Sequence, residues 1–405
     1  MYFSLMDCHI LGLDLRESGY INPSLIYSLR VLDKMSKRIH RWIPTLLLLL
    51  VALSVLTTAE QSIVVEDALG RRIELPGVPR RVVSMTPSIT EVLAELDLLD
   101  RVVGVDSFSM SDWYLNASGR LREMGVVDVG GYWWSAIRVE EILRLNPDVV
   151  LADSGAHKPL LETLESYNVT VVYIHGGSAR SVNEVLSDIY TIGLVFNETS
   201  RAEELIGRIT SGLNEGFKIL RPYSGRRILV VLDFWQGIWV AGRATFIDDV
   251  LSRLGLVNAA TTYGWSAVSV ETVSKWSPDL IIVACSYATN ETIREAGLYD
   301  LGKPIVLLNS TEVDIISRPG PLIQLVPRVL YAALERGLGK PVETPTVTTP
   351  QATTVTIKET ETTAITTQGG MAGAMEMNQA VAITIVVAIA VFFTGLYIGS
   401  RRRGS

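Results

Sequence analysis

Cysteine and histidine are scarce in this sequence. Its 405 residues include two cysteines and four histidines. Cys8 lies close to the N-terminus, so the rest of the chain contains Cys285 alone, and a framework of disulfides is excluded. His157 and His175 are the histidines of the central region, and neither has a partner at metal-ligand spacing. The sequence therefore predicts neither a resident metal site nor a cofactor.

The motifs of several catalytic and nucleotide-binding sites are also missing. The sequence contains no HExxH, no GxSxG and no GxxxxGK[ST]. Its net charge of −7 does not favour nucleic-acid binding, which usually requires a basic surface. We therefore expect a protein that is not an enzyme, does not hydrolyse ATP itself and binds no nucleic acid.

The N-terminal region has the pattern of an export signal. Residues 1–36 show no periodic element, and we interpret them as an N-terminal extension, since Met35 is a better start for the signal. Residues 37–59 join basic side chains to an apolar run that ends in small residues, a pattern that favours a secretory signal peptide over an N-terminal anchor because the run is short for a membrane span. No cysteine follows this run to accept a lipid. Five sequons agree with export and with glycosylation: Asn116, Asn168, Asn197, Asn290 and Asn309.

The C-terminal region predicts a membrane anchor. Residues 341–376 are rich in threonine and lack aromatic side chains, so we expect a stalk without a core of its own. Residues 377–400 are uncharged and long enough to cross a bilayer as a helix. The basic residues 401–405 then place the tail in the cytoplasm. These features predict a cell-membrane protein with a single C-terminal span and an extracellular central domain.

One stretch of the central region occurs twice. Residues 139–152 read VEEILRLNPDVVLA, and residues 270–284 read VETVSKWSPDLIIVA. Each copy has a glutamate (Glu140 or Glu271) in the first turn of a short amphipathic helix, followed by a Pro-Asp turn and a buried strand. Any α/β fold reuses such a unit, but two copies 131 positions apart favour two similar lobes.

The remaining patterns complete the two lobes. We expect an N-terminal α/β lobe over residues 60–178, a linking helix region over 179–220 and a C-terminal α/β lobe over 221–340. Residues 62–76 predict a hairpin, and 107–135 are typical of a loop. The expected helix starts are Thr86 or Ser88 in the first lobe and Thr245 or Asp248 in the second. Of the one or two helices within 179–220, the first is expected to act as a stiff strut.

Aromatic side chains gather in the predicted connections. They follow the carboxyl ends of predicted strands, the edge at which open α/β sheets bind ligands. Some are expected to be packing residues, and the others suit a large, flat ligand. Arg318 precedes Pro319, Gly320 and Pro321, where it either meets an anionic ligand group or belongs to a plain helix entry. The candidate ligand residues are Phe108, Trp113, Tyr132, Trp133, Trp134, Phe234, Trp235, Trp265 and Arg318.

Glu140 and Glu271 have two interpretations. A carboxylate near a helix N-terminus is stabilised by about 0.3–1 kcal/mol, which alone accounts for one glutamate in each copy. Their equivalent placement instead favours docking onto a two-fold partner that presents arginines.

These segments together resemble a known family, the substrate-binding proteins of ABC importers for cobalamin, ferric siderophores and haem. The resemblance covers most of residues 62–338 and rests on RRVVSMTPSITEVL (80–93), RVVGVD (101–106), VGGYWWSAIRVEEILRLNPDVVLA (129–152), VAGRATFIDDVLSRLGLVNAA (240–260), SAVSVETVSKWSPDLIIVA (266–284) and SRPGP (317–321). It implies two Rossmann-like α/β lobes joined by one long rigid helix, with the ligand in the cleft between them. By resemblance, Glu140 and Glu271 dock onto the permease dimer.

The pattern is most similar to that of the cobalamin-binding member. By this resemblance Phe108, Trp133 or Tyr132, Phe234 or Trp235, and Trp265 line the cleft. Arg243 and Arg318 leave a ferric siderophore open, and Tyr114, Tyr132 or Tyr263 could supply the iron ligand of a haem binder. The ligand, whether cobalamin or a ferric chelate, is then cargo rather than a cofactor.

We therefore predict a tethered extracytoplasmic receptor that delivers a corrinoid to an ABC permease, with ATP hydrolysed by a separate cytoplasmic subunit. A C-terminal tether in place of a lipid fits a cell without an outer membrane, archaeal in style. The alternative ligand is a ferric siderophore or haem. Two other classes stay open: an enzyme acting on a metal-tetrapyrrole on the same fold, which would need more cysteine or histidine in the cleft, and a surface adhesion protein, which would not need two docking glutamates.

Overall fold

The computed structural model describes residues 62–115 and 117–340, together with scattered helical positions between 24 and 43. The predicted signal peptide, the threonine-rich stalk and the C-terminal span lie outside these residues, apart from single positions of the signal segment. Within the described part of the chain, no helix combines the length and the apolar character that a membrane crossing requires.

The N-terminal lobe, residues 62–178, contains a hairpin and a parallel sheet. The hairpin joins β1 (Ile63–Glu66) to β2 (Arg72–Leu75) as predicted, and Gly70 takes a φ of +73° in its turn. The sheet has the order β5-β4-β3-β6-β7 with every neighbouring pair parallel. Its strands are β3 (Val82–Ser84), β4 (Val102–Val105), β5 (Val127–Asp128), β6 (Val149–Asp153) and β7 (Val171–Ile174).

Short helices connect these strands. They are α2 (Pro87–Glu95), α3 (Ala117–Glu123), α4 (Val139–Leu145), α5 (Ser154–His157) and α6 (Leu161–Ser166). Thr86, one of the two expected caps, begins α2, because its side chain accepts a hydrogen bond from the Ile89 amide and Pro87 occupies the first turn. The expectation of a loop over 107–135 is wrong, since this segment contains α3, β5 and two 3₁₀ turns. Elements of two to seven residues are too short for periodicity to reveal.

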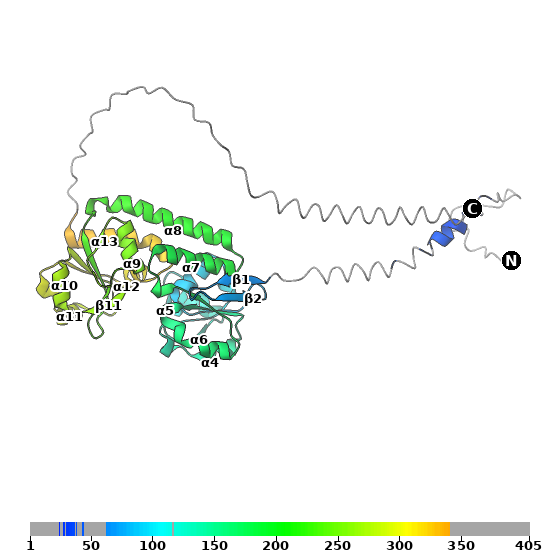
Figure 1. Cartoon of the computed structure of the whole chain (residues 1–405), viewed down its shortest axis with the longest axis horizontal. Coiled ribbons are helices and arrows are strands. Elements are labelled where there is room, and N and C mark those ends of the chain that lie inside the picture. The colour runs from blue at the N-terminus through cyan, green and yellow to red at the C-terminus, as the bar shows by residue number, and fades with distance from the viewer. Residues whose placement is uncertain are drawn as a thin grey trace, which may run out of the picture. The chain divides into compact units, whose positions relative to one another are not determined.

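Two helices, and not one, occupy the linking region. They are α7 (Val182–Val195) and α8 (Thr199–Leu220), and the turn between them places Asn197 at a φ of +57°. Both helices contact the C-terminal lobe: α7 packs beside β1, α2 and α9, and the longer α8 packs on α7, α9 and α13 and runs along both lobes for about 33 Å (Figure 1). A Cβ on Gly193 of α7 would lie 2.6 Å from the Ala202 Cβ, so glycine allows the two helices to approach closely.

The C-terminal lobe, residues 221–340, has a mixed sheet. The order is β11-β9-β8-β12-β13, with β10 also beside β8. Strands β8, β10, β12 and β13 are parallel, whereas β9 pairs antiparallel with both β8 and β11. The strands are β8 (Arg227–Asp233), β9 (Ile238–Ala241), β10 (Val257–Asn258), β11 (Trp265–Val268), β12 (Leu280–Val283) and β13 (Ile305–Leu307).

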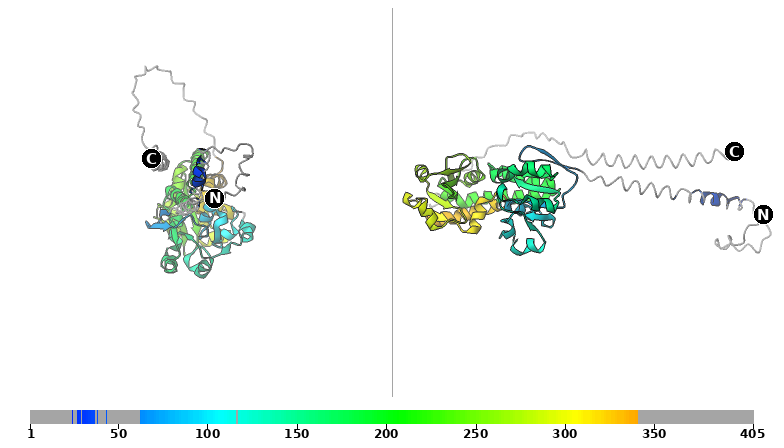
Figure 2. Two further views of the ribbon diagram at one scale, coloured as in Figure 1. Left: turned by 90° about the vertical axis from the view of Figure 1, so that its right-hand side faces the viewer. Right: turned by 90° about the horizontal axis from the view of Figure 1, so that it is seen from below.

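Five helices cover this sheet: α9 (Phe246–Arg253), α10 (Val270–Trp276), α11 (Asn290–Glu295), α12 (Ser310–Ser317) and α13 (Val326–Leu338). Thr245, one of the two expected starts, caps α9 through the Asp248 amide, and Gly255 follows the helix at a φ of +78°. Seen from below, the yellow and orange C-terminal lobe lies beside the blue and cyan N-terminal lobe (Figure 2).

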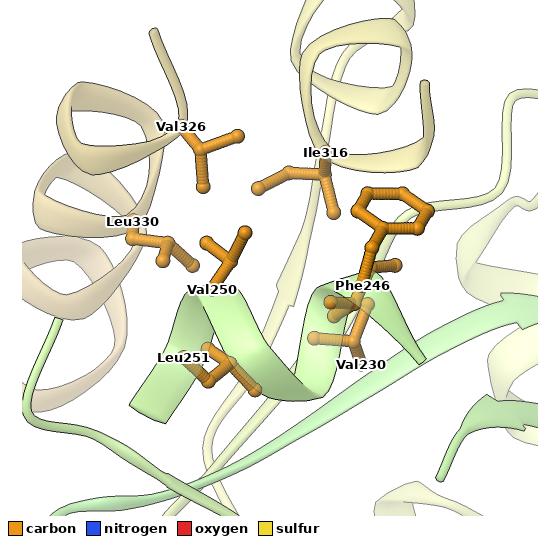
Figure 3. Close-up of a pocket in the computed structure, with 8 residues that line it drawn as sticks. Val230, Phe246, Val250, Leu251, Ile316, Val326 and Leu330 are labelled. Atoms are coloured by element: carbon orange, nitrogen blue, oxygen red, sulfur yellow. The ribbon is translucent and has the colours of Figure 1, made fainter. Parts of the chain in front are cut away.

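A continuous apolar core joins the lobes along α8. It contains buried residues of both sheets and of α2, α7, α8, α9 and α13. In the C-terminal lobe, Val230, Phe246, Val250 and Ile316 point toward one another around a gap of about 10 Å³ (Figure 3). Such a gap is no larger than a single water molecule requires, so we assign it to core packing and not to a binding site.

Candidate functional site

The predicted ligand residues fall into three groups in the structure. Phe108, Trp133, Trp134 and Trp235 follow the carboxyl ends of strands and are 48–65% exposed. Trp113, Trp265 and Arg318 make polar contacts between the lobes. Tyr132 and Phe234 are partly covered by their own lobes. The nine residues therefore differ in exposure and in their partners.

Two of the exposed aromatic residues, Phe108 and Trp235, are held through their backbone amides by aspartates at strand ends. Asp106 follows β4 and accepts hydrogen bonds from the Phe108 and Ser109 amides at 2.9 and 3.1 Å. Asp233 ends β8 and accepts the Trp235 amide at 2.7 Å. Each aromatic residue thus begins a turn two positions after an aspartate. Burial raises the pKa of Asp106 to about 6. These aspartates were not among the sequence-based candidates, although their positions at strand ends were a readable signal.

Two tryptophans connect the lobes in opposite directions. Trp113 of the N-terminal lobe donates its indole N–H to Asp314 Oδ2 of α12 at 2.9 Å. Trp265 of the C-terminal lobe donates its indole N–H to the Gly177 carbonyl at 2.9 Å. Both indoles remain 38–40% exposed, so each has an uncovered surface beside its interlobe bond.

Arg318 lies in a buried ion cluster at the lobe interface. Its Nη1 contacts Glu91 Oε1 at 2.6 Å and Asp112 Oδ2 at 2.9 Å, and its Nη2 contacts Asp314 Oδ1 at 2.9 Å. Glu91 and Asp112 come from the N-terminal lobe and their side chains are fully buried. Burial raises the pKa of Glu91 well above its ordinary value. Three carboxylates therefore surround the guanidinium that the sequence suggested for an anionic ligand group.

Tyr132 is held by hydrogen bonds within its lobe. Its hydroxyl donates to Asp153 Oδ2 at 3.0 Å, and its carbonyl lies 2.6 Å from His157 Nε2. The His157 Nδ1 accepts the Asp153 amide at 3.1 Å, so the Nε2 nitrogen carries the proton and donates to Tyr132. Burial lowers the pKa of His157, and burial beside Asp153 raises that of Tyr132 well above its ordinary value.

The remaining tyrosine and arginine candidates have different environments. Tyr114 donates its hydroxyl to Glu95, and burial raises its pKa above the ordinary value. Tyr263 and Arg243 are exposed, and their backbones pair as an isolated bridge. Among the described residues, no group of three or more histidine, cysteine, aspartate or glutamate side chains has the arrangement of a metal site.

The repeated unit has the same geometry in both lobes. Glu140 and Glu271 are exposed in the first turns of α4 and α10, two helices of seven residues each. Both helices end at a residue in the left-handed conformation, Asn146 at a φ of 44° and Ser277 at 46°.

An arginine and an aspartate complete each unit, and the sequence patterns did not single out the arginines. Asp148 Oδ2 accepts the Arg81 amide at 2.9 Å, and Asp279 Oδ2 accepts the Arg227 amide at 2.8 Å. Arg81 and Arg227 also donate from Nη2 to the carbonyls at the ends of α4 and α10. The signal was an Arg-Arg pair at the start of the first strand of each lobe's sheet, at 80–81 and 226–227.

Comparison with known proteins identifies this arrangement. The family model described as "Periplasmic binding protein" matches residues 82–296. The ABC transporter substrate-binding lipoprotein YvrC of Bacillus subtilis, itself uncharacterised, is 24% identical over 267 residues, covering 64% of this chain and 81% of the relative. The cobalamin-binding protein of Halobacterium salinarum is 25% identical over 272 residues, covering 64% and 70%. The petrobactin-binding protein YclQ of Bacillus subtilis has the same fold, with a TM-score of 0.56 at 18% identity over 68% of this chain and 99% of that one.

Proposed function

Because the chain belongs to the periplasmic binding protein family, we propose that it is the extracytoplasmic receptor of an ABC importer that captures a corrinoid such as cobalamin. The family match over residues 82–296 includes most of the N-terminal lobe, the linking region and the first part of the C-terminal lobe, and the relatives are substrate-binding proteins rather than enzymes. The resemblance found in the sequence is thereby confirmed at the level of the family. The identity of the ligand, the docking surface and the membrane tether are the parts that we propose.

The exposed aromatic side chains are the observation on which the ligand proposal rests. Trp133, Trp134 and Trp235 are 48–65% exposed at strand ends where their own lobes do not cover them. A tryptophan buries up to about 250 Å² when covered, so covering half of one contributes about 3 kcal/mol at ~25 cal/mol per Å². A large flat ligand that covers several such rings gains enough free energy to bind tightly. The cobalamin-binding relative from Halobacterium salinarum favours a corrinoid among such ligands.

The tyrosines favour a corrinoid over a haem held through a phenolate. A phenolate ligand forms most readily where surrounding groups lower the pKa of the hydroxyl. Tyr114 and Tyr132 instead donate hydrogen bonds to carboxylates, and burial raises both pKa values. The Tyr263 side chain is instead 71% exposed, so a ligand can reach it. For this reason a ferric chelate is the second candidate ligand.

We assign delivery of the ligand to the two repeated units. Glu140 and Glu271 project from equivalent exposed helix starts, one in each lobe, and a permease dimer presents a two-fold surface to match them. Arginines on that surface would pair with the carboxylates. A separate cytoplasmic subunit hydrolyses ATP. The threonine-rich segment and the apolar segment over 377–400 hold the receptor at the membrane.

Tryptophan fluorescence of the purified full-length protein tests the ligand proposal. We expect saturable quenching by cobalamin, corrected for its absorbance, and none by a ferric siderophore or haemin. Trp235→Ala should weaken cobalamin binding by about 100-fold, because the loss of about 3 kcal/mol from one covered ring corresponds to about two factors of ten. Trp276→Phe is the matched control, since Trp276 ends α10 and packs against the core of its own lobe.

Each outcome of the titration distinguishes the two candidate ligands. Quenching by haemin or a ferric siderophore alone would reject the corrinoid and support iron uptake. In that case Tyr263→Phe should reduce affinity if the exposed phenol contacts the metal. Equal affinity of Trp235→Ala and the wild type for cobalamin would instead place the ligand away from the strand ends.

A further inference from the structure

Asp153 is a buried carboxylate that none of the sequence patterns singled out as functional. It ends β6 and is 1% exposed. Its Oδ1 accepts the amides of Gly155 and Ala156 at 2.7 and 3.2 Å, which caps α5. Its Oδ2 accepts the Gly177 amide at 2.7 Å and the Tyr132 hydroxyl at 3.0 Å. The carboxylate therefore joins the ends of three separate segments, and capping α5 uses only one of its oxygens.

The space around Asp153 admits no further side chain. A Cβ on Gly176 would lie 2.4 Å from Asp153 Oδ2, and Gly176 also has a φ of +53°. A Cβ on Gly177 would lie 2.7 Å from the Tyr132 hydroxyl oxygen. The two glycines are thus required by the carboxylate and the phenol beside them, and they bring the 176–177 backbone into direct contact with Asp153.

The hydrogen bonds of Asp153 lead to candidate ligand residues of both lobes. Gly177, held through its amide, accepts the indole N–H of Trp265 at its carbonyl. Tyr132, held through its hydroxyl, packs edge to face against Trp133 with ring centroids 5.2 Å apart. One carboxylate therefore supports an exposed ring of the N-terminal lobe and the acceptor for an indole of the C-terminal lobe.

We propose that Asp153 is a positioning residue of the ligand site, which sets the placement of Trp133 and Trp265 through Tyr132 and Gly177. The inference rests on the proposed function, because it takes these rings to contact the ligand. A carboxylate suits the position because both oxygens accept, whereas asparagine presents one oxygen and one NH₂ group. With asparagine, either the Gly177 amide or the amides of α5 would face a donor.

The test compares Asp153→Asn with the wild type in the full-length protein. With 5-fluorotryptophan incorporated, the ¹⁹F resonance of Trp265 is identified by its loss in Trp265→Phe. Without ligand, we expect this resonance to shift in Asp153→Asn, because the Gly177 carbonyl is no longer held in place. In a cobalamin titration, the dissociation constant should rise about 10- to 100-fold.

Tyr132→Phe separates the two connections. It removes the hydroxyl that binds Asp153 and keeps the Gly177 contact, so the Trp265 resonance should stay in place while cobalamin affinity falls about threefold to tenfold. If Asp153→Asn does not fold, this variant decides alone, and an unchanged affinity would overturn the proposal.

Asp148→Asn is the matched control, since Asp148 flanks the other end of β6 and accepts the amides of Arg80 and Arg81 at 2.7 and 2.9 Å. It makes the same chemical change beside the same strand, and we expect neither the Trp265 resonance nor the affinity to change. The positioning role is refuted if folded Asp153→Asn leaves both readouts unaltered, or if Asp148→Asn alters both equally. If the wild type binds no cobalamin but the Trp265 resonance still moves in Asp153→Asn, the corrinoid proposal fails and the positioning geometry stands.

Discussion

The two lobes share one repeated unit but complete their sheets differently. In both, a seven-residue helix with an exposed glutamate leads through a left-handed cap and an aspartate turn into a buried central strand. The N-terminal lobe continues with parallel strands only, whereas the C-terminal lobe places the antiparallel pair β9 and β11 beside β8. The shared sequence also includes two candidate ligand residues, because Trp134 and Trp265 are 131 positions apart, as Glu140 and Glu271 are, whereas Trp133 corresponds to Gly264.

The shared unit therefore supplies the proposed docking helices and part of the candidate ligand site. A dimeric permease presents the same surface twice, so two equivalent docking helices suit it. A single asymmetric ligand imposes no such equivalence, and beside the shared tryptophan the lobes differ, with Trp133 in one and Gly264 in the other. The lobe interface is unequal as well, because the N-terminal lobe supplies Glu91 and Asp112 and the C-terminal lobe supplies Arg318 and Asp314.

The largest effect should come from reversing the charge of both docking glutamates. In Glu140→Arg with Glu271→Arg we expect ligand uptake by cells to fall at least about 100-fold, because arginines on the receptor would face arginines on the permease. Cobalamin affinity of the purified receptor should not change, since both glutamates are exposed on helices outside the aromatic site. Each single reversal should cause a similar intermediate loss if the two lobes dock equivalently.

Glu291→Arg is the control for that comparison. Glu291 is also an exposed glutamate in the first turn of a short helix, α11, and pairs only with Arg294 of the same helix among the described residues. Uptake should persist in this variant. Normal uptake in the double reversal would show that the repeated units are not docking sites.

The next largest effect should come from breaking the ion cluster at the lobe interface, to which the two lobes contribute different side chains. Arg318→Met removes the guanidinium that contacts Glu91, Asp112 and Asp314, and leaves two of these carboxylates fully buried. We expect the free energy of unfolding to fall by about 3–5 kcal/mol, as measured by chemical denaturation. Arg243→Met, at an exposed position of the same lobe, should change it by less than about 0.5 kcal/mol. Similar losses in the two variants would contradict the ion cluster.

A smaller loss of stability should come from substituting the glycines that allow neighbouring helices to pack closely against α8. In Gly216→Ala the new Cβ would lie 2.3 Å from Pro327 of α13, so we expect a loss of about 1–3 kcal/mol in unfolding free energy. Gly193→Ala tests the N-terminal side in the same way through Ala202. Gly207→Ala has nothing within 4 Å and should stabilise the helix by about 0.5–1 kcal/mol. A loss in Gly207→Ala equal to that in Gly216→Ala would mean that contact with α13 is not the cause.

The smallest effect is a change in pH dependence. Burial raises the pKa of Glu91 in the folded chain above its ordinary value of 4.5. The folded chain therefore binds this proton more tightly, so the contribution to stability is complete below pH 4.5 and is lost as pH rises through the folded pKa. Glu91→Gln should remove this part of the slope in unfolding free energy plotted against pH. An identical slope in the wild type and Glu91→Gln would show that Glu91 does not titrate in this way.

Much of the fold could be predicted from local patterns. The hairpin with Gly70, the Thr86 cap and the buried strands of the repeat arise from glycine conformation, capping chemistry and apolar runs, all of which act within a few residues. The prediction failed where elements are short, as over 107–135. For 179–220 it left one helix or two open, because apolar spacing continues through the turn at Asn197, and the structure has two.

By itself, the sequence determined the family, the repeated unit and its two glutamates, because these depend on residues close together in the chain. Only the tertiary structure decided which candidates face solvent and which join the lobes. The partners of Trp265 and Trp113 are 88 and 201 positions away, and Glu91 is 227 positions from Arg318. The proposed role of Asp153 also depends on the tertiary structure, because its hydrogen-bond partners Tyr132 and Gly177 lie before and after it in the sequence and contact it only in the folded chain. A hydrogen bond or ion pair forms only where the folded backbone brings the donor and the acceptor within about 3 Å of each other. A pattern of neighbouring residues does not reveal which distant residues meet in this way.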